Sequence, residues 1–146
     1  MTKTRECIEW IKDYFKDNPK GKAIIGISGG KDSTIAAALC VEALGADRVI
    51  GVLMPQGMQR DITDSYKVVG TLKLQYHLIN IGATYETLCQ SISKAIFLSG
   101  GDKAIESNSM ITTNLPARLR MATLYAVAAE YKNSRVVNTC NYSEDY

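Results

Sequence analysis

The chain has 146 residues, of which 46% are hydrophobic and 22% are charged, a balance that suits one globular domain with a real core. The formal net charge is only +2 and no run of like charges occurs, which argues against a surface that binds nucleic acid. No stretch is long enough to span a bilayer, and the N-terminus lacks an apolar signal core. We therefore expect a cytoplasmic protein with no membrane partner.

Cysteine usage gives no sign of a metal or redox centre. The cysteines lie far apart in the sequence and form no CxxC pair: Cys7, Cys40, Cys89 and Cys140. His77 is the one histidine that could join them as a ligand, so neither a zinc site nor a redox pair is expected. We expect reduced thiols, most of them buried.

Strand and helix patterns alternate along the chain. Apolar residues at helical spacing over residues 7–15 are followed by the turn Asn18-Pro19-Lys20-Gly21. The predicted strands span residues 23–27, 47–53, 76–80 and 135–139. The predicted helices after the first strand span residues 34–39, 61–73, 85–98 and 116–131. This order predicts an α/β fold, a doubly wound parallel sheet with helices on both faces, in a single domain over residues 1–146.

The first predicted strand ends in the loop Ser28-Gly29-Gly30-Lys31-Asp32-Ser33. Two adjacent glycines let the backbone turn sharply, so that successive N–H groups and the positive end of the next helix face one concavity. An anion such as phosphate is the natural occupant. The loop is not a Walker A motif, because Gly26 and Gly30 stand one residue too close and Asp32 follows the lysine.

SGGxDS in this setting resembles the pyrophosphate loop of the ATP pyrophosphatases, which split ATP between the α and β phosphates. The amides of residues 29–32 and the hydroxyls of Ser28 and Ser33 are the expected donors to pyrophosphate. The carboxylate of Asp32 is the expected magnesium ligand. The alternative is a plain strand-to-helix turn with Asp32 as the N-cap.

The same letters recur at Ser99-Gly100-Gly101-Asp102, in a different context. The residues before them repeat at helical spacing, so these glycines are predicted to end a helix in the left-handed conformation. We expect no ligand there. His77 is likewise predicted to be a sheet residue and not a catalytic base.

Segments that follow strands are the places where a parallel sheet binds ligands. Residues 54–61 offer backbone and amide groups that could meet adenine or ribose, although a turn before a helix capped by Asp61 explains them equally well. In residues 138–144, Thr139 could donate to ATP and Glu144 could join Asp32 around magnesium. A plain loop is the alternative there.

Residues 114–121, NLPARLRM, are predicted to start a helix with Asn114 as its N-cap and Pro116 in its first turn. Arginines at the positive end of a helix are unfavourable unless an anion lies opposite. Residues two apart on a helix point in nearly opposite directions, so we favour Arg118 over Arg120 for a ligand contact. The alternative is a pair of solvated arginines on a surface helix.

Together, SGGKDS, the MPQGMQRDITD stretch, NLPARLRM and NTCNYSE resemble the ammonia-dependent NAD synthetase family in order and spacing, over nearly the whole chain. The resemblance implies an adenine nucleotide alpha-hydrolase-like fold and a homodimer. It implies that ATP activates the nicotinate carboxylate of deamido-NAD as an acyl adenylate, that pyrophosphate leaves, and that ammonia attacks to give NAD. The implied ATP contacts are Gly26, Ile27, Ser28, Gly29, Gly30, Lys31, Asp32, Ser33, Gln59 and Thr139.

The same resemblance implies that Arg118 contacts deamido-NAD and that Asp32 and Glu144 hold Mg²⁺, with no side chain in a catalytic acid or base role. The family continues past the position of Tyr146 with lysines that hold ATP, so we expect a short chain that binds ATP and turns over poorly. No glutaminase segment precedes the synthetase part, which makes free ammonia the expected nitrogen donor. Two alternatives are a tRNA-modifying enzyme with the same loop and a nucleotide-binding domain without turnover.

Overall fold

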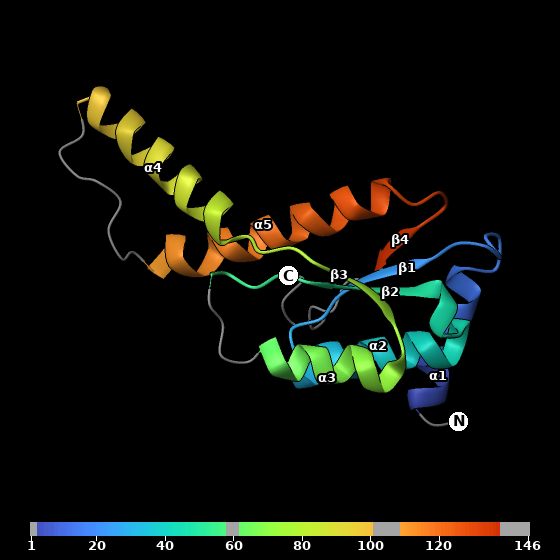
Figure 1. The fold of residues 1–146 in the computed structure, drawn as a ribbon. Helices are drawn as coiled ribbons and strands as arrows, with labels where there is room; N and C mark the ends of the chain where they lie inside the picture. The colour runs from blue at the N-terminus through green and yellow to red at the C-terminus, as the bar shows by residue number, and fades with distance from the viewer. Residues whose placement is uncertain (1–2, 58–61, 101–108, 138–146) are drawn as a thin grey trace.

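A computed structural model of the chain describes residues 3–57, 62–100 and 109–137 (Figure 1). Within them, the strands are β1 (Ala23–Gly26), β2 (Val49–Leu53), β3 (Gln75–Leu78) and β4 (Arg135–Val137). The helices are α1 (Lys3–Tyr14), α2 (Lys31–Leu44), α3 (Ile62–Leu72), α4 (Gly82–Leu98) and α5 (Ser109–Ala129), with a short 3-10 turn η1 (Ala46–Arg48). The four strands pair in parallel in the order β3-β2-β1-β4.

The central strand β1 has a neighbour on each side. Ile25 is in register with Gly51 of β2 and with Val137 of β4. Because β1 and β2 are covered on both faces, they are apolar without alternation, as buried parallel strands usually are. The prediction of a doubly wound parallel sheet is confirmed.

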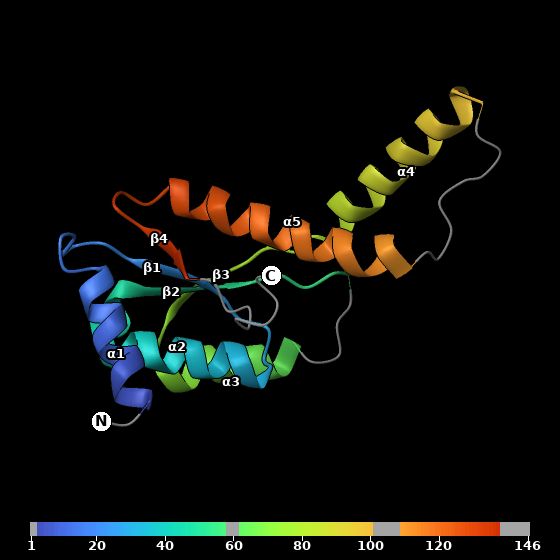
Figure 2. The ribbon, with the colours of Figure 1, turned by 180° about the vertical axis from the view of Figure 1, so that it is seen from behind.

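Helices cover both faces of the sheet, and Figure 2 shows α1, α2 and α3 below it and α5 above it. Consecutive strand residues point to opposite faces, so Ile25 packs in one core with Phe15 and Cys40, whereas Ile24 packs in the other with Leu124 of α5. Burial raises the pKa of the Cys40 thiol to about 11. The two cores hold the sheet between two helical layers.

The start of α5 differs from the prediction. The helix begins at Ser109, so Asn114 is not its N-cap and Pro116 lies inside it. A proline removes one backbone donor and crowds the preceding turn, yet the hydrogen bonds on either side continue the helix. Pro116 is also buried, and its packing offsets part of that cost. An Asn two residues before a Pro was therefore a misleading start signal.

Two other expectations concern α4 and α1. Helix α4 ends at Leu98 and Gly100 has φ +97°, which confirms that this glycine follows a helix end and does not open a helix; Gly101 and Asp102 lie outside the described residues. Cys7 is exposed, so the expectation of buried thiols is wrong there, because α1 covers the neighbouring layer with only one face. Among the described residues, no helix is both long and apolar enough to cross a membrane.

Candidate nucleotide site

The carboxyl ends of the parallel strands meet at one edge of the sheet, on the left of Figure 1, and α2, α3 and α5 begin on that side. The loop that joins β1 to α2 lies at this edge, as does the turn that follows β2. A doubly wound sheet binds its ligand in this position. The candidate site is therefore built from loops that a rigid sheet holds in place.

Gly29 makes the turn between β1 and α2 possible. Its φ is +81°, a conformation that costs a residue with a side chain about 1–2 kcal/mol. A Cβ added at Gly29 would lie 2.9 Å from the Cβ of Asp64 and 3.1 Å from the backbone nitrogen of Ser65. Helix α3 therefore lies directly against the loop. Both the backbone angle and the available space require a glycine.

The two serines of the loop hydrogen-bond to the loop itself. The Ser33 hydroxyl donates to the carbonyl oxygen of Gly30 at 3.2 Å and accepts from the amide of Ser28 at 3.2 Å. The two hydroxyl oxygens lie 3.0 Å apart, and the Ser28 oxygen also accepts from the amide of Gly30 at 3.2 Å. Ser33 is only 5% exposed, so its hydrogen bonds stabilise the loop from its buried side.

Gly30 is the N-cap of α2, and no side chain caps the helix there. Asp32 lies inside the first turn, so the alternative in which Asp32 is the N-cap is wrong. The first intrahelical bond runs from the amide of Thr34 to the carbonyl of Gly30 at 3.1 Å. The earlier amides have no acceptor within the helix, and the helix dipole adds positive potential around them. This end of α2 suits an anion.

Helix α3 supports the loop through Ser65, a residue that was not predicted from the sequence to belong to the site. Its hydroxyl donates to the carbonyl oxygen of Ile27 at 3.4 Å, and the side chain is only 3% exposed. A signal existed, because Ser65 precedes the buried Val69 by four residues and so lies on the apolar face of α3. A polar residue on a buried face needs a partner, and the loop carbonyl provides it.

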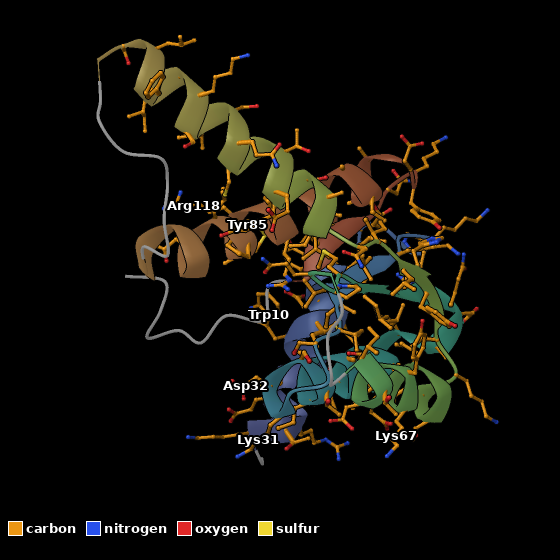
Figure 3. All side chains as sticks on the ribbon, turned by 60° about the vertical axis from the view of Figure 1, so that its left-hand side comes forward. Trp10, Lys31, Asp32, Lys67, Tyr85 and Arg118 are labelled. Atoms are coloured by element: carbon orange, nitrogen blue, oxygen red, sulfur yellow. The ribbon has the colours of Figure 1, made fainter. Side chains whose placement is uncertain are left out.

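The two arginines of α5 point in different directions, as helix geometry predicts. Arg120 is half-buried, its Nε donates to the carbonyl oxygen of Met54 at 3.0 Å, and burial lowers its pKa. Arg118 is exposed, and Figure 3 shows it on the same side of the molecule as Lys31 and Asp32 of α2. The alternative of two solvated arginines is therefore wrong for Arg120, which holds the turn after β2.

Other predicted residues fall in different places. Gln59, Thr139 and Glu144 lie outside the described residues. His77 lies in β3 and hydrogen-bonds the Tyr131 hydroxyl, which confirms that it is a sheet residue. Among residues 3–57, 62–100 and 109–137, no three acidic, histidine or cysteine side chains are grouped as a metal site.

Comparison with known proteins decides the family. Residues 3–146 match the NAD synthase family. The chain belongs to this family. An NH(3)-dependent NAD(+) synthetase of Pyrococcus furiosus is 36% identical over 137 residues, which are 92% of this chain and 48% of that protein. The chain thus spans about half the length of the curated relatives it matches.

Solved structures of the family share its fold. An NH3-dependent NAD synthetase from Campylobacter jejuni aligns with a TM-score of 0.72 and 31% identity, over 97% of this chain and 56% of that one. An NMN synthetase from Francisella tularensis aligns with a TM-score of 0.77 and 29% identity, over 97% and 54%. The fold of this chain is therefore shared with solved structures named as NAD and NMN synthetases.

Gly29→Ala tests the geometry of the loop. We expect a loss of about 1–2 kcal/mol in the free energy of unfolding, measured in urea, because the new side chain meets Asp64 at a positive φ. Gly70→Ala in α3 is the control, since a Cβ there would meet no atom within 4 Å and Gly70 has no positive φ. Equal losses for the two variants would contradict the turn.

Proposed function

We propose that this protein works as an ammonia-dependent NAD synthetase in the cytoplasm, and that the described residues form its ATP site. The observation that carries the proposal is the SGGKDS loop, with Gly29 at positive φ and the uncapped start of α2, in a chain of the NAD synthase family. The proposed substrates are ATP, deamido-NAD and ammonia. The free thiols of Cys7, Cys40 and Cys89 fit a reducing compartment.

The proposed reaction has two steps. The nicotinate carboxylate attacks the α phosphorus of ATP, pyrophosphate leaves, and ammonia then displaces AMP from the acyl adenylate to form the amide. Negative charge grows on the departing pyrophosphate, and preorganised donors stabilise such charge strongly. The amides at the start of α2 and the exposed Lys31 are suited to this role. Positioning and charge, without a side-chain acid or base, account for the chemistry.

The donor chemistry at the loop fits Mg²⁺. Asp32 offers an exposed carboxylate in the first turn of α2, beside the amides expected to hold phosphate. Mg²⁺ commonly binds through one or two carboxylates together with substrate phosphates, so a group of three protein ligands is not required. Asp32, with Glu144 as the second carboxylate, would hold the ion. Bound there, Mg²⁺ would neutralise charge on the phosphates.

Arg118 is proposed to contact deamido-NAD. It is exposed on α5, on the side of the molecule where α2 begins, whereas Arg120 is engaged with Met54. A guanidinium suits the phosphates of a dinucleotide, because it donates in a fork that matches two oxygens. Since one structural neighbour is an NMN synthetase, nicotinic acid mononucleotide is the alternative acid substrate to compare.

A homodimer is proposed through α4 and α5. Both views show α4 running away from the sheet (Figures 1 and 2), and its final residues Phe97 and Leu98 are 69% and 72% exposed. Tyr125 of α5 is 61% exposed as well. Large apolar side chains exposed on a projecting helix are typical of a protein interface, and two-fold dimers use the same patch on both subunits.

Two alternatives make different predictions. A tRNA-modifying enzyme would share the loop, but the net charge of +2 gives little attraction for a polyanion. A nucleotide-binding protein without turnover would bind ATP and form no NAD. NAD formation from deamido-NAD and ammonia distinguishes the proposed synthetase from both.

ATP binding tests the site. Calorimetric titration with ATP and Mg²⁺ should show binding, and Asp32→Ala should weaken it by about tenfold or more, because a charged ligand of the ion is lost. When EDTA removes Mg²⁺, the wild type and the variant should bind alike. Asp47→Ala, an exposed acidic residue in η1, is the control and should leave ATP affinity unchanged.

Addition of deamido-NAD and ammonium to the same samples tests the reaction. AMP and pyrophosphate should form in equal amounts with NAD. Release of ADP and phosphate would contradict the proposal, as would equal ATP affinity for Asp32→Ala and the wild type in Mg²⁺. ATP binding with no NAD formed would contradict the proposal and favour one of the two alternatives.

Arg118→Ala should weaken deamido-NAD binding by about tenfold or more, the value of one charge-assisted hydrogen bond, and leave ATP binding nearly unchanged. Arg120→Ala in the same helix is the comparison, because the Nε of Arg120 donates to the carbonyl oxygen of Met54 and not to the ligand. Titrations with deamido-NAD and nicotinic acid mononucleotide measure both variants. Equal losses for ATP and deamido-NAD in Arg118→Ala would overturn the assignment.

Phe97→Asp should shift the protein toward monomer in analytical ultracentrifugation, because a carboxylate in an apolar interface is costly to desolvate. Trp10→Asp on α1 is the control, since Trp10 is a comparably exposed aromatic residue at 62%. The wild type and Trp10→Asp should sediment as dimers. A monomeric wild type, or a dimer that Phe97→Asp leaves intact, would refute this interface.

A further inference from the structure

The turn of residues 54–57, which follows β2, is held by backbone hydrogen bonds that extend the sheet. Beyond the last paired residues of β2 and β3, the amide of Ile79 donates to the carbonyl oxygen of Leu53 at 2.8 Å. The amide of Ile81 then donates to the carbonyl oxygen of Pro55, also at 2.8 Å. The β2–β3 pairing therefore continues as far as Pro55.

Where the backbone pairing ends, the side chain of Asn80 hydrogen-bonds to the turn. Its Nδ2 donates to the carbonyl oxygen of Gly57 at 3.0 Å, and its Oδ1 accepts from the amide of Gly57 at 2.9 Å. The same Oδ1 accepts from the amide of Gly82 at 2.8 Å. The side-chain amide thus pairs with both polar groups of Gly57, which fixes the turn in position and in orientation.

Two glycines permit this arrangement. Gly57 has φ +69°, which other residues rarely adopt. A Cβ added at Gly82 would lie 2.6 Å from the backbone nitrogen of Gly57, closer than real side chains approach. The start of α4 therefore lies directly against the turn, and Asn80 holds the two together.

The turn adjoins the end of β1, which leads into the β1–α2 loop. A Cβ added at Gly26, the last residue of β1, would lie 3.2 Å from the methyl carbon of Met54. Arg120 of α5 holds the carbonyl oxygen of Met54 from the other side. The turn is thus fixed between the end of β1, α4 and α5. Its half-buried Gln56 and the backbone around Gly57 are neutral donors and acceptors, which suit a base or a ribose better than phosphate.

We propose that Asn80 is a positioning residue of the nucleotide site, which sets the affinity for the adenosine part of ATP by fixing the turn of residues 54–57. The inference rests on the proposed function of the β1–α2 loop. The proposal predicts different effects on two ligands, because pyrophosphate needs only the β1–α2 loop whereas ATP needs both the loop and the turn. A purely structural Asn80 would not distinguish these two ligands.

The free protein provides the first test. Hydrogen exchange of the Gly57 and Gly82 amides should be at least about tenfold faster in Asn80→Ala than in the wild type, since both amides lose their acceptor. Gln90→Ala, which removes an exposed amide side chain from α4, should leave both rates unchanged. If the Gly57 and Gly82 amides exchange at the same rate in Asn80→Ala as in the wild type, then Asn80 does not fix the turn, whether or not ATP binds.

Binding provides the second test. Asn80→Ala should lose about tenfold in ATP affinity, or 1.4 kcal/mol, and should bind inorganic pyrophosphate like the wild type. Asn80→Asp keeps the shape but puts an oxygen against the carbonyl of Gly57, so it should show the same selective loss. Gly82→Ala should show the same selective loss of ATP affinity, because its new Cβ would displace Gly57 while every polar group is kept.

The outcomes separate the two proposals. If the wild type binds neither ATP nor pyrophosphate, the proposed function fails. The hydrogen-exchange experiment still shows whether Asn80 fixes the turn of residues 54–57. If the wild type binds both and the variants lose both ligands in proportion to their melting temperature, or lose neither, then Asn80 is structural and the inference is overturned. Should Asn80→Ala fail to fold, the isosteric Asn80→Asp and Gly82→Ala carry the same comparison.

Discussion

The turn at Gly29 is the constraint on which the rest of the site depends. The chain must leave the central strand, reverse under the first turn of α3, and enter α2 within a few residues. Only a residue without a side chain has both the backbone freedom and the space, because Asp64 and Ser65 lie against it. This turn places the start of α2 at the sheet edge, so the geometry of the candidate anion site depends on the packing of α3 on the loop.

Polar groups around the site divide into two sets. The hydroxyls of Ser33 and Ser65, the guanidinium of Arg120 and the amide of Asn80 bond to backbone groups of the loops, so they fix the shape of the site. Lys31, Asp32 and Arg118 are exposed at the same end of the molecule. Rigid loops cost less entropy to order on binding, so the first set prepares the geometry in which the second set can act.

Local patterns were enough to predict the elements but not the contacts between them. The strands and the SGGKDS loop are visible in the sequence because apolar runs and glycine pairs act over a few residues. Ser65 and Asn80 bond to groups 38 and 23 residues away, and no local spacing reports such a pairing. Asn114 shows the opposite error, since a local cap signal was overridden by a helix that begins at Ser109.

Sheet order explains why residues far apart in sequence belong to one site. The chain builds outward from β1 through β2 to β3, then returns through α5 to place β4 on the other side of β1. The crevice of a doubly wound sheet opens where this direction reverses, which here is between β1 and β4. Val137 is in register with Ile25, so β4 ends next to the end of β1, which leads into the β1–α2 loop. The proposed roles of Thr139 and Glu144 beside Asp32 require only that residues soon after Val137 stay near that edge.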